Sequence, residues 1–241
     1  VFLSNKTQGI LSADASLANS RYPMQTRQNI RFSRMFSGAF MFAAGSYVGI
    51  DYNETRGMVT GSSLSGLAGE GANNLYGWGI AHEIGHNMDK LGKAEITNNI
   101  YSLALQAWDG SSMSLNTRLT QDGRWADIFN KVAQGRPGTA NNVFVQLGMY
   151  WQLHLAYDGA EEPMAFYNQF FKLWKSGAYS GYTTDERVAL IASKVADRDL
   201  TEFFTRWGMT LSPAVKAILD DYPAEDRAIW YLNDASRNHR L

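Results

Sequence analysis

The apolar positions of this chain predict strands near its start and helices over most of the rest. Residues 40–50 form an apolar run of aromatic and β-branched side chains with interspersed glycines, which is typical of an edge or bulged strand. A stretch rich in Gly, Ser and Asn over residues 61–74 predicts a loop. A helix is predicted over residues 75–89, and Gly92 is placed to end it.

Helical segments follow one another through the second half of the chain. Helices are predicted over residues 95–108, 122–134, 142–157 and 163–177. Thr184 can cap a further helix, and Ser212-Pro213 places an N-cap before a proline at the first helical position. Residues 228–232 predict a short strand. The order of these elements predicts an α+β fold.

The length of 241 residues allows one large domain or two lobes that share a core. We expect a single domain over residues 1–241, with a sheet-rich lobe over 1–92 and a helical lobe over 93–241. The chain begins with Val1 and shows no signal peptide. We therefore expect a domain excised from a longer exported protein of bacterial origin, and an intracellular origin stays open.

Composition excludes several classes of chemistry. The chain has no cysteine, so disulfides, thiol catalysis, thiolate metal sites and iron–sulfur clusters are ruled out. The formal net charge of -1 gives no electrostatic attraction to nucleic acid or to anionic membranes. No run of about 18 apolar residues is present, so no membrane insertion is predicted.

The segment His82-Glu83-Ile84-Gly85-His86 carries the clearest chemical signal. Two histidines four residues apart lie on one helix face, which lets both imidazoles bind one zinc ion at about 2.0–2.1 Å. Glu83 then lies beside a zinc-bound water and can take its proton as the water attacks a carbonyl. The motif predicts one catalytic Zn²⁺ and a general base. The alternative is a helix with two solvated or capped histidines.

Gly85 adds to this interpretation. Glycine within a helix costs about 1 kcal/mol relative to alanine. Its presence between the two histidines indicates that another part of the chain approaches closely there.

A catalytic zinc ion needs a third protein ligand and an open fourth position. The HExxHxxGxxH pattern would supply a histidine, but Asp89 and Gly92 stand where that pattern has Gly and His. Asp89 is itself a rival ligand, and it competes poorly because it follows His86 by only three residues.

Glu95 is the first glutamate after the motif and is the predicted third ligand. As part of a helix over 95–108, it would begin a polar face that continues through Asn98, Asn99 and Ser102. The alternative is an ordinary solvated helix start, where the helix dipole favours an acidic residue.

Several motifs together resemble the enhancin-like, mucin-degrading family of gluzincin metallopeptidases. They are NLYGWGIAHEIGHN (74–87), EITNNIYS (95–102), the apolar run over 41–50 and DLTEFFTRWG (199–208). The resemblance implies a thermolysin-like (gluzincin) catalytic domain, with an N-terminal mixed sheet and active-site helix packed on a mainly helical C-terminal lobe. It also implies a secreted or cell-surface protease that acts on mucins and other O-glycoproteins, flanked by carbohydrate-binding modules.

One residue departs from the wider gluzincin pattern. Many gluzincins place an Asp four residues after the ligand glutamate, where it orients a zinc-bound histidine, whereas this chain has Asn99. The amide oxygen of Asn99 can accept an imidazole N–H, but it carries no charge. We therefore expect a smaller effect on the basicity of the ligand.

Further candidates depend on helix and strand faces. Tyr150, His154 and Tyr157 share one face of the helix predicted over 142–157. Tyr150 or His154 is a candidate donor to the oxyanion, and a packed helix with a satisfied histidine is the alternative. His239 lies in a polar tail and is predicted to be solvated.

Residues 43–48 are a candidate edge strand that pairs with the substrate backbone through Gly45, Ser46 and Tyr47. An interior strand is the alternative. The aromatic residues that can stack on sugar rings are Trp78, Trp151, Trp174 and Tyr179. Packing in the core is the alternative for each of them.

We predict a zinc endopeptidase that hydrolyses peptide bonds in O-glycosylated, mucin-type proteins. Proteolysis follows from the residues, whereas the glycoprotein preference rests on the resemblance alone. An aminopeptidase fits less well because no Gly-x-Met-x-Asn motif precedes the metal helix. The alternatives are a zinc endopeptidase without a glycan requirement and a non-catalytic glycoprotein-binding module with a structural zinc, against which Glu83 argues.

Overall fold

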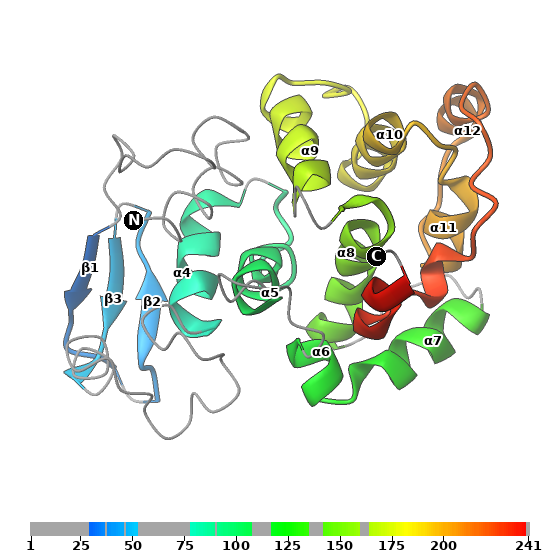
Figure 1. The fold of residues 1–241 in the computed structure, drawn as a ribbon. Coiled ribbons are helices and arrows are strands. Elements are labelled where there is room, and N and C mark those ends of the chain that lie inside the picture. Colours follow the sequence, from blue (N-terminus) through cyan, green and yellow to red (C-terminus); the bar gives the residue numbers. More distant parts are fainter. Residues whose placement is uncertain are drawn as a thin grey trace.

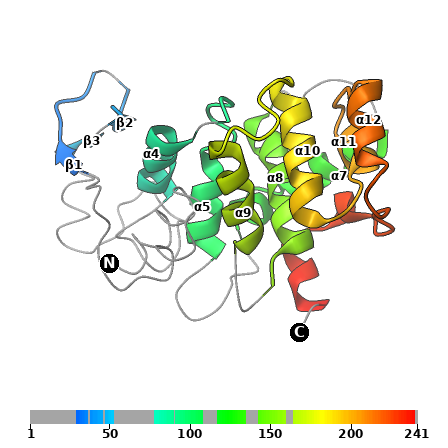
Figure 2. The ribbon, with the colours of Figure 1, turned by 90° about the horizontal axis from the view of Figure 1, so that it is seen from above.

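A small sheet at one end and a helical body at the other make up the protein in a computed structural model (Figure 1). The structure describes residues 29–36, 38–45, 47–52, 78–89, 91–107, 117–134, 142–159 and 164–239. From one end to the other, the sheet is followed by helix α4, then by α5, and then by the remaining helices (Figures 1 and 2). The predicted α+β class is confirmed.

The sheet has three strands in the order β1-β3-β2: β1 (Asn29–Phe32), β2 (Met41–Ala43) and β3 (Tyr47–Ile50). Strand β3 is central, with β1 parallel to it and β2 antiparallel. The prediction of one strand over residues 40–50 is wrong. The run folds back on itself as a hairpin, because Gly45 adopts φ 70°, a left-handed conformation that glycine takes without strain.

Helix α4 (Trp78–Met88) carries the histidine motif and packs between strands β2 and β3 on one side and α5 (Asn99–Ala107) on the other. The second helix thus begins four residues later than predicted. The N–H groups of Ile96 and Thr97 both donate to the Lys93 carbonyl at 3.0 Å, so residues 94–98 form a tight turn instead.

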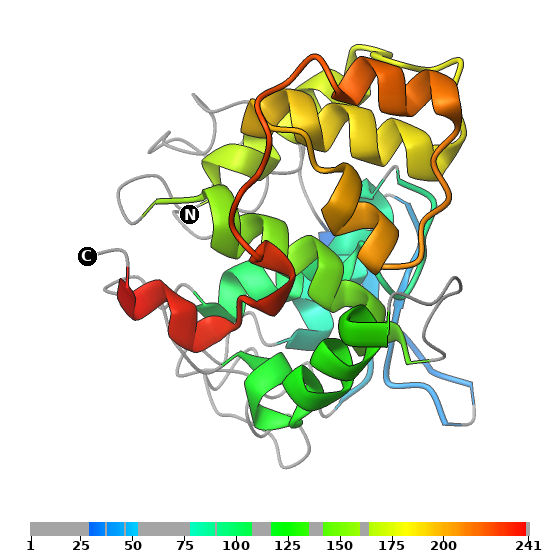
Figure 3. The ribbon, with the colours of Figure 1, turned by 90° about the vertical axis from the view of Figure 1, so that its right-hand side faces the viewer.

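The remaining helices form the other lobe, which Figure 3 shows end-on. They are α6 (Arg118–Gln121), α7 (Arg124–Gln134), α8 (Val143–Tyr157), α9 (Ala165–Lys175), α10 (Thr184–Ala196), α11 (Thr201–Arg206) and α12 (Pro213–Leu219). Helix α8 is buried on nearly all sides, and most of the other elements pack around it. The aromatic candidates Trp151 and Trp174 both lie in this core.

Local capping explains most of these boundaries. Ser212 accepts from Val215 N at 3.4 Å, as its predicted N-cap role requires, and Asn142, predicted as the first residue of its helix, is instead the N-cap and accepts from Phe144 N at 2.8 Å. The cap of α10 is Thr183 and not Thr184. The helix predicted over 122–134 starts only after Gly123, whose φ of 67° separates α6 from α7.

The strand predicted over residues 228–232 is also wrong. This segment holds a short 3-10 helix, η2 (Ile229–Tyr231), and a second one, η3 (Asp234–His239), follows it. The side-chain amide of Gln152 donates to the carbonyls of Trp230 at 2.6 Å and Leu232 at 3.2 Å. A buried side chain thus satisfies backbone acceptors that would otherwise need a neighbouring strand.

Among the described residues, none of the helices has the length and apolar character that crossing a membrane requires.

Candidate metal centre

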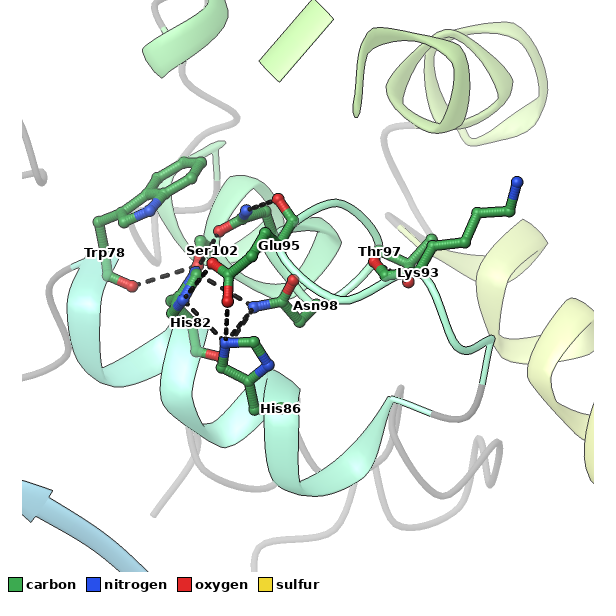
Figure 4. A network of polar contacts seen from close by, with 9 residues as sticks. Trp78, His82, His86, Lys93, Glu95, Thr97, Asn98 and Ser102 are labelled. Atoms are coloured by element: carbon green, nitrogen blue, oxygen red, sulfur yellow. Dashed lines mark hydrogen bonds and ion pairs between the residues drawn. The ribbon is translucent and has the colours of Figure 1, made fainter. Parts of the chain in front are cut away.

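Three side chains converge between α4 and the turn before α5 (Figure 4). The Nε2 atoms of His82 and His86 lie 3.0 Å apart. The Glu95 carboxylate reaches His82 Nε2 at 3.2 Å through one oxygen and His86 Nε2 at 3.1 Å through the other. Within the described part of the chain, these three residues are the group whose ligand atoms are close enough to hold one metal ion.

The spacing of these atoms fits zinc. Ligands about 2.0–2.1 Å from a tetrahedral zinc ion lie about 3.3 Å from one another. The three separations here are 3.0, 3.1 and 3.2 Å, so a small shift accommodates the ion. The His82, His86 and Glu95 side chains are 18%, 24% and 57% exposed, which leaves an open side for a further ligand or a substrate.

The hydrogen bonds of Asn99 define the protonation of His82. The Asn99 side-chain amide donates to the Glu95 carbonyl at 2.8 Å, so its oxygen must be the atom 2.7 Å from His82 Nδ1. In the neutral ring, His82 Nδ1 therefore carries the proton, and the lone pair of Nε2 faces the Glu95 carboxylate. Two such acceptors at 3.2 Å repel each other unless a proton or a metal ion lies between them. The donor set thus fits a metal ion.

The side chain of Asn98 lies against both histidine rings. It is fully buried, and its amide nitrogen lies 3.1 Å from His82 Nδ1 and 3.2 Å from His86 Nε2. A Cβ on Gly85 would stand 2.3 Å from the Asn98 carbonyl oxygen, closer than real Cβ atoms approach. The predicted close approach at Gly85 is therefore confirmed. Because Gly85 has no side chain, the loop before α5 can lie directly against α4.

The backbone of Glu95 adopts an unfavourable conformation. Its φ of 67° lies in the left-handed region, which a residue with a Cβ adopts at a cost of about 1 kcal/mol or more. Such strain is retained where the surrounding contacts over-determine it, and it is common at functional sites. Ser102, predicted on the same polar face, instead donates to the Trp78 carbonyl at 3.1 Å and ties α5 to α4.

Glu83 lies near His82 and Glu95, whose charges act on its carboxyl. Burial raises the pKa of its carboxyl, the His82 ring lowers this pKa, the Glu95 carboxylate raises it, and a hydrogen bond with the Ala43 backbone lowers it. The net direction is upward, as suits a proton acceptor that works near neutral pH. The bond to Ala43 also shows that β2 passes beside Glu83.

The rival ligand Asp89 points elsewhere. One of its carboxylate oxygens accepts from the Thr97 hydroxyl at 2.5 Å, and the other accepts from the Leu91 N–H at 3.0 Å. Asp89 therefore closes the loop that carries Glu95 and is not brought to the histidines.

Two predicted catalytic residues lie in the interior. Tyr150 is 1% exposed, and burial together with Asp185 and Asp89 raises the pKa of its hydroxyl. His154 is 3% exposed and its Nδ1 pairs with Asp158 at 2.6 Å. We do not retain either residue as the oxyanion donor, because a substrate cannot reach a side chain packed in the core.

The predicted substrate-binding residues have mixed positions. Trp78 is buried at the start of α4, with the Arg118 guanidinium 4.9 Å from its ring centre. Gly45 lies in the hairpin turn and Tyr47 lies in the central strand β3, so residues 43–48 do not form one edge strand. Ser46 lies outside the described residues. Tyr179 is half-buried near Tyr182 in the α9–α10 connection.

Sequence reasoning missed Asn87 and Thr97. Asn87 accepts from the Gly45 N–H at 2.6 Å and donates to the Tyr47 carbonyl at 3.3 Å, which ties the hairpin to the metal helix. Its place directly after His86 is the signal that could have identified it. No local signal marks Thr97, because its partner is defined only by the fold.

An α+β fold with a His-His-Glu group on a helix and its following loop is the arrangement of a metallopeptidase. The family model of peptidase M60, enhancin and enhancin-like, matches residues 10–208. The chain belongs to this peptidase M60 family.

Solved structures agree with this assignment. The ZmpB metallopeptidase of Clostridium perfringens is 26% identical with a TM-score of 0.74, over 98% of this chain and 47% of that one. The M60 catalytic domain of ZmpC from the same organism, solved with the sialyl T antigen, is also 26% identical with a TM-score of 0.74, over 98% and 44%. Another structure of ZmpB, with a TM-score of 0.72 and 26% identity over 98% and 24%, joins the M60 domain to two CBM51 domains.

A curated relative is TRPM8 channel-associated factor 3 of Rattus norvegicus, which is 25% identical over 89% of this chain. The match covers 23% of that protein. The chain thus spans less than half of the solved chains and about a quarter of the rat protein.

Proposed function

We propose that this chain is a zinc-dependent endopeptidase that cuts O-glycosylated, mucin-type proteins. The observation that carries the proposal is the convergence of His82 Nε2, His86 Nε2 and the Glu95 carboxylate within 3.0–3.2 Å, with Glu83 near His82 and Glu95. These three side chains hold the zinc ion, and Glu83 is the base.

Each residue has a defined chemical task in this proposal. Bound zinc supplies an acidified water and polarises the carbonyl to be cut. The Glu83 carboxylate takes the proton of the attacking water and passes it to the leaving amine nitrogen. Asn99 keeps the proton of His82 on Nδ1, so that Nε2 stays free to bind the metal.

Strand β2 is the proposed binding edge for the substrate backbone. Ala44 N donates to the Tyr47 carbonyl and Asp51 N to the Phe40 carbonyl, both at 2.9 Å. In this antiparallel ladder, Met41 and Ala43 take the alternate positions, whose backbone groups face away from β3. A substrate paired with β2 then places its carbonyl beside Glu83, which contacts Ala43.

The glycoprotein preference draws on the relatives. ZmpC was solved with the sialyl T antigen, and a ZmpB structure carries two CBM51 domains beside its M60 domain. We extend the preference for glycosylated substrates to this chain. We also propose that residues 1–241 form one thermolysin-like catalytic domain, with a sheet-rich lobe over 1–92 and a helical lobe over 93–241. On this proposal the chain works outside the cell or at its surface, with carbohydrate-binding modules elsewhere in the full protein.

The experiment compares peptides that differ only in one O-linked glycan. Zinc-loaded protein is incubated with the glycosylated and the bare peptide, with and without a chelator, and products are identified by mass spectrometry. We expect chelator-sensitive cutting of the glycosylated peptide only. Equal cutting of both would retain the protease and remove the glycan requirement, whereas cutting of neither would overturn the proposed activity.

A further inference from the structure

The third metal ligand is the least supported of the three by its own contacts. The Glu95 side chain is 57% exposed, compared with 18% for His82 and 24% for His86. Both histidines belong to a regular helix, whereas Glu95 lies in the turn before α5 with φ 67°. The position of its carboxylate therefore depends on what holds that connection in place.

A charge-assisted hydrogen bond joins the two ends of the connection between α4 and α5. The Thr97 hydroxyl donates to the Asp89 carboxylate at 2.5 Å, which joins the first part of the connection to its end. The second oxygen of Asp89 accepts the Leu91 N–H at 3.0 Å, and the Thr97 N–H donates to the Lys93 carbonyl at 3.0 Å. These bonds enclose the segment that contains Glu95.

Thr97 acts from the side of the loop that faces away from the histidines. Figure 4 shows Thr97 and Lys93 turned away from the two rings, while Glu95 reaches toward them. Thr97 is fully buried, and besides the Asp89 carboxylate its hydroxyl has the Lys93 carbonyl within reach, at the longer distance of 3.1 Å. Neither Thr97 nor Asp89 belongs to the group of side chains that could hold the metal ion, which is His82, His86 and Glu95.

A second tie reaches the same loop from the other lobe. The Lys93 ammonium pairs with Asp185 in the first turn of α10. These two side chains are 26% and 44% exposed, so solvent screens their attraction and the pair contributes little. The Thr97–Asp89 bond, whose donor is fully buried, is therefore the stronger of these two restraints.

We propose that Asp89 and Thr97 are positioning residues that hold Glu95 at the metal centre and so set the affinity for zinc. The inference rests on the proposed function, because it takes His82, His86 and Glu95 as the zinc ligands. Losing the bond frees the loop that presents the Glu95 carboxylate, while the two histidines stay in place on α4. Removal of residues that support metal ligands typically lowers metal affinity about 10–100-fold.

The chain offers a matched control for the test. Thr117 is also fully buried, and its hydroxyl donates to the Asp234 carboxylate at 2.6 Å in the helical lobe. Thr97→Val and Thr117→Val therefore delete the same kind of bond at two places. Thr97→Ser keeps the hydroxyl and serves as the conservative variant.

The measurement is the zinc dissociation constant, obtained by competition with a chromogenic chelator, together with the melting temperature of the metal-free protein. We expect Thr97→Val to weaken zinc binding at least about tenfold, and Thr97→Ser and Thr117→Val to bind like the parent. Thr117→Val should lower the melting temperature of the metal-free protein. If Thr97→Val does not fold, Asp89→Asn takes its place with the same expectation of weaker binding.

Three results would contradict the proposal, each in a different way. Zinc binding by Thr97→Val equal to that of the parent would overturn the role of Thr97 and leave the proposed function intact. Equal weakening in Thr97→Val and Thr117→Val would also overturn it, because the effect would then be one of general stability. A parent protein that binds no zinc would overturn the proposed function itself.

Discussion

The backbone N–H of Gly45, in the β2–β3 turn, donates to the side-chain oxygen of Asn87 at 2.6 Å. Asn87 directly follows His86 on the metal helix, and its amide also donates to the Tyr47 carbonyl at 3.3 Å. One side chain thus joins both sides of the hairpin turn to the helix that carries the histidines. The distance between the metal centre and the edge of β2 depends on this contact.

Asn87→Ala should raise the KM for a peptide substrate about 10-fold or less while leaving zinc affinity unchanged, because it removes about 1–2 kcal/mol of hydrogen bonding to the turn. Steady-state kinetics and chelator competition on the same preparations measure the two effects. Asn87→Asp retains the acceptor for the Gly45 N–H, so its KM should lie between those of the parent and Asn87→Ala. Loss of zinc affinity in Asn87→Ala with an unchanged KM would show that the residue supports the metal ion and not the strand.

Asn99→Asp should weaken zinc binding, although the aspartate would bring a negative charge close to the His82 ring. The Asn99 amide donates to the Glu95 carbonyl at 2.8 Å, and an aspartate would place an unprotonated oxygen against that carbonyl. The repulsion would disturb the Glu95 turn, which already holds φ 67°. Chelator competition measures the change, and tighter binding by Asn99→Asp would mean that the added charge outweighs the lost hydrogen bond.

Gly85→Ala should destabilise the protein, although alanine is the better helix former by about 1 kcal/mol. The added Cβ meets the Asn98 carbonyl oxygen at 2.3 Å, and overpacking of this kind typically costs about 1–3 kcal/mol. Gly181→Ala is the control, because no atom lies within 4 Å of its added Cβ. Denaturant unfolding of both variants tests the sign, and a Gly85→Ala protein as stable as the parent would contradict the close contact.

Glu186→Gln should lower stability in a pH-dependent way. Hydrogen bonds from Ser212 and Thr183 lower the pKa of the Glu186 carboxyl from 4.5 to about 2. Because the folded-state pKa lies below the unfolded one, the stabilisation is complete above pH 4.5 and is lost as the pH falls towards 2. Melting temperatures of parent and variant should therefore differ at pH 7 and converge by pH 2. A difference that stays constant over this range would refute the assignment.

Elements with local signals were predicted well. Ser212 with Pro213 and Asn142 mark helix starts by their own side chains, so the sequence contains the whole of that information. The 3-10 helix Ile229–Tyr231 was predicted as a strand because its backbone partner is Gln152, distant in sequence and brought near only by the fold. The hairpin in residues 40–50 was missed because Gly45 lies in a continuous apolar run.

The site shows the same division. The histidine motif and the choice of Glu95 follow from spacing and from the identity of the residues, which sequence alone supplies. The helix predicted to begin at Glu95 does not do so, because the Lys93 carbonyl accepts two N–H groups and closes a turn there. Thr97 was overlooked for the same reason as Gln152, since its partner Asp89 is known only from the fold.

The most direct test of the account is cutting of a mucin-type glycopeptide by zinc-loaded parent and zinc-loaded Glu83→Gln. The two side chains have nearly the same shape, but the amide cannot accept the proton of the attacking water. We predict equal zinc content in both proteins and a rate at least about 100-fold lower for Glu83→Gln. Equal rates at equal zinc content would contradict the role of Glu83 and the proposed mechanism with it.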